Sequence, residues 1–466
     1  MAAVLLSNPE ATFAVLLGIA NHLYFKRYEP DRKAVIQTAC VLLAGPAIQL
    51  FALQRFGALT ISRSGFFIAY SAFFATMATS IILYRLSSFH PLAKVPGPFI
   101  FRVTKFWRMY IAWTGRQHTI IKALHDQYGP IVCTGPNDIS VVDLDSVKAI
   151  LGTDGLPKAP FYLLTKVVGH PIALIGAKGE ERSGRRRVWS RGFTSGSVKE
   201  YQHIVVAKAN ELSDGLFDFM GEMMFGASTG MLKHGKDDQG VMKIIQGAGR
   251  FDEVTSQIPW LTYLATFIPS DSTKLRVFGF GWGKQRVQEG AKKKDLWYHL
   301  ADEEGHKKTK PSPQVVIADS ILAIVAGSDT TSTALANFFW CIMAHPSAYK
   351  RVRDEIGRVF PPGTDSLLDT SRYENLKFTK ACLFIAEETQ VQVPPMSVHH
   401  NPNHFSPSPE AFIPERWLPE EAKGLWKGVS VKMKTEAFIP FSYGPANCIG
   451  KSLAVTEMMM VFVTKC

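Results

Sequence analysis

Three apolar stretches open the chain, at residues 11–25, 35–56 and 66–84. The second and third reach the length of about 20 residues that a helix needs to cross a bilayer, while the first is shorter. No positively charged segment precedes the first stretch, so it does not have the form of a signal peptide. The pattern predicts a membrane anchor of two to three transmembrane helices. The alternative interpretation is one or two buried helices of a soluble domain.

Basic residues around these stretches predict their orientation. Four of them lie in the first connection: Lys26, Arg27, Arg32 and Lys33. Only Arg55 and Arg63 lie near the second connection. Because cytoplasmic loops carry an excess of lysine and arginine, the first connection and everything after Arg85 are expected on the cytoplasmic side.

After the apolar stretches, the pattern changes to that of a mostly helical domain. Residues 90–98 contain three prolines and predict a stiff linker, so we place the domain boundary at residue 90. Residues 118–128 have the period of an amphipathic helix, and 130–133 and 139–142 read as short strands. Residues 200–310 are mostly helical in pattern, and long helical runs follow at 312–344 and 452–463. The fold class expected for residues 91–466 is mainly α with small β-sheets.

Composition narrows the function classes. The 466 residues are 46% hydrophobic and 20% charged, with a formal net charge of +12. No basic stripe alternates with aromatic residues, so anionic lipid or an acidic protein is a better partner than nucleic acid. The six cysteines are scattered, without a CxxC pair or zinc spacing. This argues for a reducing compartment and against a disulfide scaffold.

Cys448 stands in a turn between Gly444 and Gly450, directly before the helical run at 452–463. Unpaired backbone N–H groups at a helix start favour negative charge, which lowers the pKa of a thiol. Such a thiolate is a nucleophile or a metal ligand. The alternative is a small buried cysteine in a glycine-rich turn.

A polar notch interrupts the long helical run at 312–344. It comprises Ala326-Gly327-Ser328-Asp329-Thr330-Thr331-Ser332-Thr333. Serine and threonine compete for helix carbonyls and bend a helix, so a notch of this kind often marks function. Ala326 and Thr330 share one face, and Gly327 removes bulk, so we expect a ligand to approach there. A kinked core helix with satisfied hydroxyls is the alternative.

Together these motifs resemble those of the cytochrome P450 monooxygenases. The run Phe-x-x-Gly-x-x-x-Cys-x-Gly at 441–450 is similar to the family's haem-binding loop, and Ala326 to Thr330 resemble its oxygen-activating helix. The resemblance implies that Cys448 is the axial ligand of haem iron, here haem b (iron protoporphyrin IX). It also implies that Phe441 shields the sulfur and that Gly444 and Gly450 clear space for the porphyrin.

The same resemblance assigns two further roles. Thr330 and Asp329 would deliver protons during oxygen activation, which is general-acid work. The charge cluster at 180–189 is either a solvated helix face or an anion site. In the family, an arginine in this region holds a haem propionate and an aromatic residue usually stands four positions before it. Counting back from Phe193 aligns Arg186 with that arginine and Arg182 with the aromatic position.

The chain departs from the family pattern in several places. Ala446 stands where a propionate-binding basic residue is usual, and Val391 stands where the Glu-x-x-Arg motif has its arginine. Glu388 matches the glutamate of that motif and is expected to pair with Arg416 of the Pro-Glu-Arg-Trp segment. A segment of the family's sheet is expected to be missing near 395–399, as is the C-terminal hairpin.

The resemblance implies a membrane-anchored haem-thiolate monooxygenase, most similar to fungal ones. Its reaction would insert one atom of O₂ into an apolar small molecule, such as a terpenoid of specialised metabolism. Electrons would come from NADPH through cytochrome P450 reductase, with the enzyme in the endoplasmic reticulum membrane and its catalytic domain facing the cytosol. The alternative is a catalytically impaired or inactive remnant, a membrane protein with weak or no haem binding.

Overall fold

A computed structural model describes the chain in two compact units. It leaves out residues 1–8, 29–34, 58–61, 160, 163–170, 210–214, 227–236, 238–239, 266, 291–292, 308, 362–368 and 384–392, and a few side chains within helices. The first unit comprises Met1–Gly115, Ile131–Ser140 and Thr255–Ile268. The second comprises Arg116–Pro130, Val141–Val254 and Pro269–Cys466.

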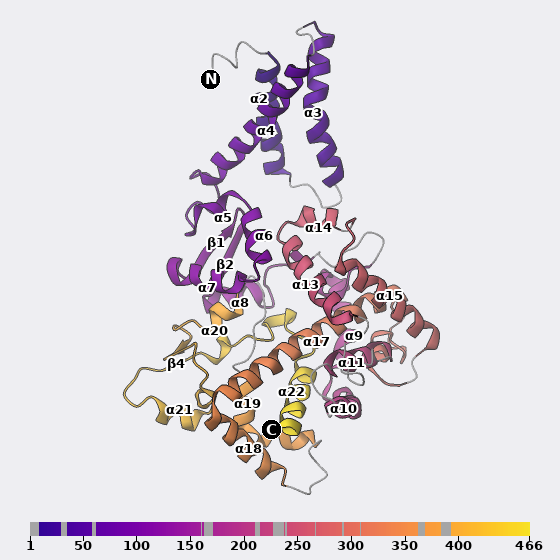
Figure 1. Ribbon diagram of the computed structural model, residues 1–466, viewed down its shortest axis with the longest axis vertical. Helices are drawn as coiled ribbons and strands as arrows, with labels where there is room; N and C mark the ends of the chain where they lie inside the picture. The colour runs from indigo at the N-terminus through magenta and orange to yellow at the C-terminus, as the bar shows by residue number, and fades with distance from the viewer. Residues whose placement is uncertain are drawn as a thin grey trace. The chain divides into compact units, whose positions relative to one another are not determined.

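The first unit contains the apolar N-terminal helices and a small hairpin (Figure 1). Its helices are α2 (Pro9–Arg27), α3 (Val35–Arg55), α4 (Arg63–Leu86), α5 (Phe99–Val103), α6 (Phe106–Trp113) and α14 (Pro259–Ala265). Strands β1 (Ile131–Gly135) and β2 (Asp138–Val141) pair with each other, and the last residue of β2 belongs to the second unit. The Pro96 carbonyl accepts from Cys133 N at 2.7 Å, so the proline-rich segment runs beside β1.

Helices α2 and α4 run parallel and pack closely. A Cβ atom on Gly18 would lie 2.8 Å from the Phe73 carbonyl, so only glycine allows this approach. Further along both helices, His22 Nδ1 lies 2.7 Å from Ser80 Oγ. Helix α3 connects them, which gives an up–down–up order. Residue numbers rise together on α2 and α4 because both helices point the same way.

By length and hydropathy, α3, α4 and α17 (Pro313–Ala344) qualify as membrane spans among the described helices. In the most apolar window of α3 and α4 only 11% of residues are buried within the protein, against 50% for α17. Helix α17 is therefore a core helix of the second unit, and α3 and α4 are the exposed apolar ones.

The second unit is almost entirely helical. Its early helices are α7 (Gln117–Tyr128), α8 (Leu144–Leu151), α9 (Gly179–Gly192), α10 (Ser195–Ala209), α11 (Gly215–Phe225), most of α13 (Val241–Ser256), α15 (Asp271–Glu289) and α16 (Leu296–Leu300). After α17 come α18 (Pro346–Val359), α19 (Lys377–Leu383), α20 (Pro395–His399), α21 (Pro419–Leu425) and α22 (Lys451–Lys465). Strands β3 (Phe405–Ser406) and β4 (Lys432–Met433) pair antiparallel. Short 3-10 turns include η3 (Leu174–Gly176), η5 (Pro414–Trp417) and η7 (Gly444–Ala446).

Helix α17 is the centre of this unit (Figure 1). Its Phe338 stacks on Phe462 of α22, with ring centroids 3.5 Å apart. On another side, a Cβ atom on Gly283 of α15 would lie 2.5 Å from Ile317, so this glycine lets the two helices touch. Close packing around α17 fixes the polar notch in its middle.

The fold class predicted from the sequence is confirmed. The helix expected at 118–128 is α7, and the strands expected at 130–133 and 139–142 are β1 and β2. The long helix expected at 312–344 is α17, whose N-cap Ser312 accepts from Val315 N. Within the described part of the chain, the only sheets are the two small two-stranded ones.

Candidate functional site

Cys448 lies between the turn η7 and helix α22, as its sequence context predicts. Its N–H donates to the Phe441 carbonyl at 2.8 Å, which closes the loop on itself. The residue is exposed, and Gly450, two positions on, is the N-cap of α22. A Cβ atom on Gly450 would lie 3.9 Å from Cys448 Sγ, an ordinary contact distance, so Gly450 lies directly beside the sulfur. A thiol just before a helix start is placed where negative charge is favoured.

Gly444 has a positive φ of +67°. A Cβ atom there would lie 2.0 Å from the Leu151 carbonyl at the end of α8. Gly444 is therefore required for two reasons, because side chains are strained at this φ and because the backbone of α8 fills the space. The Leu151 carbonyl occupies the space next to Gly444.

A half-buried histidine holds the segment that leads into the Cys448 loop. His399 Nε2 accepts from Ile439 N at 3.0 Å. Burial, together with the charges of His400 and His404, lowers the pKa of His399 to about 3, so the ring is neutral and able to accept at neutral pH. Ile439 lies two residues before Phe441, so this bond fixes the direction in which the loop begins.

The notch of α17 presents an exposed polar face. Asp329 and Thr330 are both exposed, as is Ala326 one turn earlier. Thr330 Oγ1 donates to the Ala326 carbonyl at 2.7 Å, the competition for backbone that the sequence predicts. The prediction that Gly327 opens space for a ligand is wrong. A Cβ atom there would lie 2.8 Å from Met220 Sδ, so the missing side chain accommodates α11.

Helix α9 brings two arginines to the Cys448 loop. Arg186 Nη2 donates to Asn447 Oδ1 at 2.5 Å, and Arg182 Nη2 donates to the Pro445 carbonyl at 3.1 Å. Burial is the main cause that lowers the pKa of the Arg186 guanidinium; the positive charge of Arg182 adds to this, and Cys448 opposes it. The structure thus brings together Cys448 and Arg186, which are 262 positions apart.

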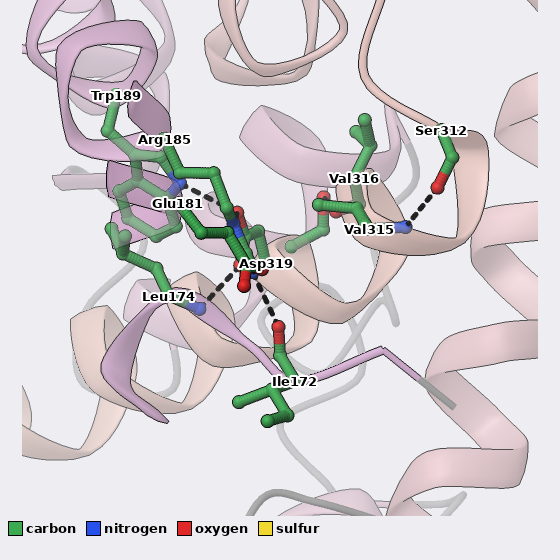
Figure 2. A network of polar contacts seen from close by, with 10 residues as sticks. Ile172, Leu174, Glu181, Arg185, Trp189, Ser312, Val315, Val316 and Asp319 are labelled. Atoms are coloured by element: carbon green, nitrogen blue, oxygen red, sulfur yellow. Dashed lines mark hydrogen bonds and ion pairs between the residues drawn. The ribbon is translucent and has the colours of Figure 1, made fainter. Parts of the chain in front are cut away.

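A buried ion pair locks α9 onto α17 (Figure 2). Asp319 pairs with the Arg185 guanidinium through both of its oxygens. It also accepts from Trp189 Nε1 at 3.0 Å and from Leu174 N at 2.7 Å. Burial raises the pKa of the Asp319 carboxyl, and the Arg185 charge opposes this. Arg185 Nη1 also donates to the Ile172 carbonyl at 2.6 Å.

This network was not predicted from the sequence, although the sequence contains a signal for it. Asp319 is an acidic residue within an otherwise apolar helical run, and a buried acid needs donors around it. Arg185 stands beside Arg186 in the same charge cluster, and only the fold shows that the two neighbours point to different partners.

Of the expected pair of Glu388 and Arg416, the structure describes only Arg416. Glu388 and Val391 lie outside the described residues. Arg416 is buried, and its Nη2 donates to the Pro407 and Ser408 carbonyls, both at 2.7 Å. In the part of the chain that is described, the Arg416 side chain thus holds the turn after β3.

Comparison with known proteins now identifies the family. The family model described as "Cytochrome P450" matches residues 209–384 and 383–465, more than half of the chain. The chain belongs to the cytochrome P450 family. It is a P450 monooxygenase with a haem-thiolate cofactor.

Curated fungal P450 proteins are similar to this chain over most of their length. "Cytochrome P450 67" of Uromyces fabae is 27% identical, over 97% of this chain and 92% of that protein. "Tryprostatin B 6-hydroxylase" of Aspergillus fumigatus is 26% identical, over 96% of this chain and 88% of that protein. "Cytochrome P450 monooxygenase AKT7" of Alternaria alternata is 26% identical, over 83% and 85% respectively.

The donor set of this P450 fits a haem. Cys448 presents an exposed thiol that could hold iron, and the guanidinium groups of Arg182 and Arg186 lie at the same turn to meet carboxylates. Arginine has five N–H donors, so each retains donors beyond the bond it makes to the loop. The face of α17 that carries Asp329 and Thr330 is polar and exposed although the helix belongs to the core.

Proposed function

We propose that this P450 holds haem b through Cys448 and oxidises an apolar organic substrate, by hydroxylation or a related oxidation. The observation that carries the proposal is the exposed Cys448 thiol in a loop bounded by Gly444 and Gly450. Arg186 donates a hydrogen bond to Asn447 of this loop. When bound, the haem supplies the redox chemistry, in which two electrons and two protons send one atom of O₂ to the substrate and the other to water.

In this proposal the polar notch of α17 manages protons. The Thr330 hydroxyl donates to the Ala326 carbonyl, so its lone pairs remain able to accept from a water or another donor. Asp329 is exposed, so its carboxylate exchanges protons with solvent and hands them on at hydrogen-bond range. Phe441, whose carbonyl accepts from Cys448 N, would shield the sulfur from water.

We further propose that residues 1–90 anchor the enzyme in the endoplasmic reticulum membrane and that residues 91–466 form the haem domain facing the cytosol. Three spans are favoured over two because α2 runs parallel to α4, from Gly18 beside Phe73 to His22 beside Ser80. With the haem domain in the cytosol, an odd number of spans puts the N-terminus on the lumenal side. The basic residues that follow α2 would then face the cytosol, in agreement with the positive-inside rule.

The electron donor in this proposal is NADPH–cytochrome P450 reductase. The formal net charge of +12 suits an acidic partner as well as anionic lipid. The name of one relative, tryprostatin B 6-hydroxylase, describes hydroxylation of an organic molecule. For this chain we propose the same class of reaction, on an apolar specialised metabolite such as a terpenoid.

A carbon monoxide difference spectrum tests the proposal. The full chain in detergent should show the thiolate type of Soret band, and Cys448→Ser should abolish it. Cys40→Ser, which changes an exposed cysteine of α3, should leave the band unchanged. A wild-type protein that takes up haem without a thiolate band would show that Cys448 is not the ligand.

The same spectrum decides the second candidate, a catalytically impaired remnant with weak or no haem binding. Ala446 and Val391 favour it, because each replaces a basic residue that the family uses. Little or no haem uptake by well-folded wild-type protein would support the remnant and contradict the monooxygenase.

A further inference from the structure

The face of α17 that carries the polar notch is covered at one end and open at the other. With 3.6 residues per turn, Asp319, Ala326 and Thr330 lie within about 40° of one another around the helix, over a length of about 16 Å. Asp319 is only 4% exposed, whereas Ala326 and Thr330 are exposed. Leu322, between them in the sequence, is half-buried. The cover over this face therefore ends just before the notch.

The segment around Leu174 lies over this face at the level of Asp319 (Figure 2). The Leu174 N–H donates to Asp319 Oδ1 at 2.7 Å, and the Ile172 carbonyl accepts from Arg185 Nη1 at 2.6 Å. The Leu174 side chain is buried in the core, while those of Ile172 and Ile175 are half-buried. The segment therefore presents two partly exposed apolar side chains at the edge of the open half of the face.

Asp319 has no hydrogen-bonding capacity left for a ligand or for proton transfer. A carboxylate has about four acceptor positions. Oδ1 accepts from Leu174 N and Arg185 Nη2, and Oδ2 accepts from Arg185 Nε and Trp189 Nε1. All four positions are thus used within the protein. What this buried acid does at the notch face is to fix the backbone at Leu174.

We propose that Asp319 is a positioning residue for substrate selection. Through the Leu174 N–H, 145 positions away in the chain, it holds Ile172 and Ile175 beside the notch. There the two side chains form an apolar wall, against which the apolar part of a substrate packs. The inference rests on the proposed function, because it takes the side of the haem that faces Thr330 as the side where the substrate binds.

Two double variants isolate the hydrogen bond to Leu174 N. The Asn variant, Arg185→Met with Asp319→Asn, removes both charges but keeps an amide oxygen that can accept from Leu174 N. The Leu variant, Arg185→Met with Asp319→Leu, has a side chain of similar volume and no acceptor. The probes are imidazole and 4-phenylimidazole, which bind haem iron through nitrogen on the side away from the thiol. Only the second carries an apolar group that reaches the wall.

The Kd of each probe is measured from the shift of the Soret band, with the full chain in detergent. The Asn variant should keep the advantage in affinity that 4-phenylimidazole has over imidazole in wild type. In the Leu variant this advantage should fall about tenfold, which corresponds to about 1.4 kcal/mol, while the Kd of imidazole and the thiolate band stay unchanged. Equal ratios in the two double variants would overturn the proposal, because Asp319 would then contribute to stability alone. A wild type that binds both probes equally would also overturn it.

Ile172→Ala with Ile175→Ala changes the wall and leaves the buried ion pair intact, so it serves as the test if the Leu variant does not fold. It should weaken binding of 4-phenylimidazole and leave that of imidazole unchanged. Weakening of both probes equally, or of neither, would contradict the wall. Trp189→Phe is the control, because it removes another donor to Asp319 and keeps the Leu174 bond. Its ratio should match that of wild type.

Failure of the proposed function is recognised separately, as absence of the thiolate band from the wild-type difference spectrum.

Discussion

Replacing Asp319 by asparagine measures how much the buried ion pair between α9 and α17 contributes to stability. The side chains of Asp319 and Arg185 are only 5% and 10% exposed. Asparagine keeps the shape but removes the charge, and its NH₂ group faces donors such as Trp189 Nε1. Breaking a buried ion pair typically costs about 3–5 kcal/mol, out of the roughly 5–15 kcal/mol that stabilise a folded domain. We expect a loss in that range.

Glu181→Gln is the matched control, because Glu181 contacts the same arginine from the surface. Its carboxylate lies 3.0 Å from Arg185 Nη1 but its side chain is 61% exposed, so the expected loss is no more than about 1 kcal/mol. The assay is equilibrium unfolding in urea, in detergent, followed by tryptophan fluorescence. A change in midpoint at constant slope reports stability.

The double variant Arg185→Met with Asp319→Leu adds a second check. Apolar residues of similar volume leave no buried charge, so this protein should be more stable than Asp319→Asn alone. The reasoning is refuted if Asp319→Asn costs no more than Glu181→Gln. It is also refuted if the double variant is the least stable of the set.

Three further predictions concern the loop and the notch. Gly444→Ala should destabilise the protein by more than the roughly 1–3 kcal/mol of backbone strain alone, because the added Cβ would meet the Leu151 carbonyl. Gly428→Ala is the control, because Gly428 has a φ of +79° in open space and its variant should show the strain only. Urea unfolding measures both losses of stability. In wild type, stability should fall as pH falls from 6.5 towards 3, because His399 takes up a proton in the unfolded state but not in the folded state. His399→Gln should lose less stability over the same pH range. A difference in the free energy of unfolding between wild type and variant that does not change with pH would contradict this. Thr330→Val should lower turnover of an accepted substrate about 100-fold, within the usual range for a general acid, and leave the carbon monoxide spectrum unchanged.

The helices and the Cys448 loop could be predicted from the sequence because their signals are local. The long apolar run gives α17, and Ser312 followed by Pro313 marks its start. A cysteine between two glycines before a helical run gives the loop. The Thr330 hydroxyl bonds the carbonyl four residues earlier, which also follows from the sequence alone.

Contacts between distant elements could not be predicted in this way. Gly327 looked like an opening for a ligand because the sequence does not tell which helix packs against it, and that helix brings Met220. Arg185 and Arg186 look equivalent in the sequence, yet one turns into the core and the other towards the loop.

The Arg185–Asp319 pair also affects how the protein is made. The two residues are separated by 134 positions in the chain. At a synthesis rate of about 5–20 residues per second, Arg185 leaves the ribosome roughly 7 to 27 seconds before its partner does. During that interval the arginine, Trp189 and the α9 surface around them have no α17 to pack against. Nascent chains of this enzyme are therefore expected to depend on chaperones until α17 has emerged.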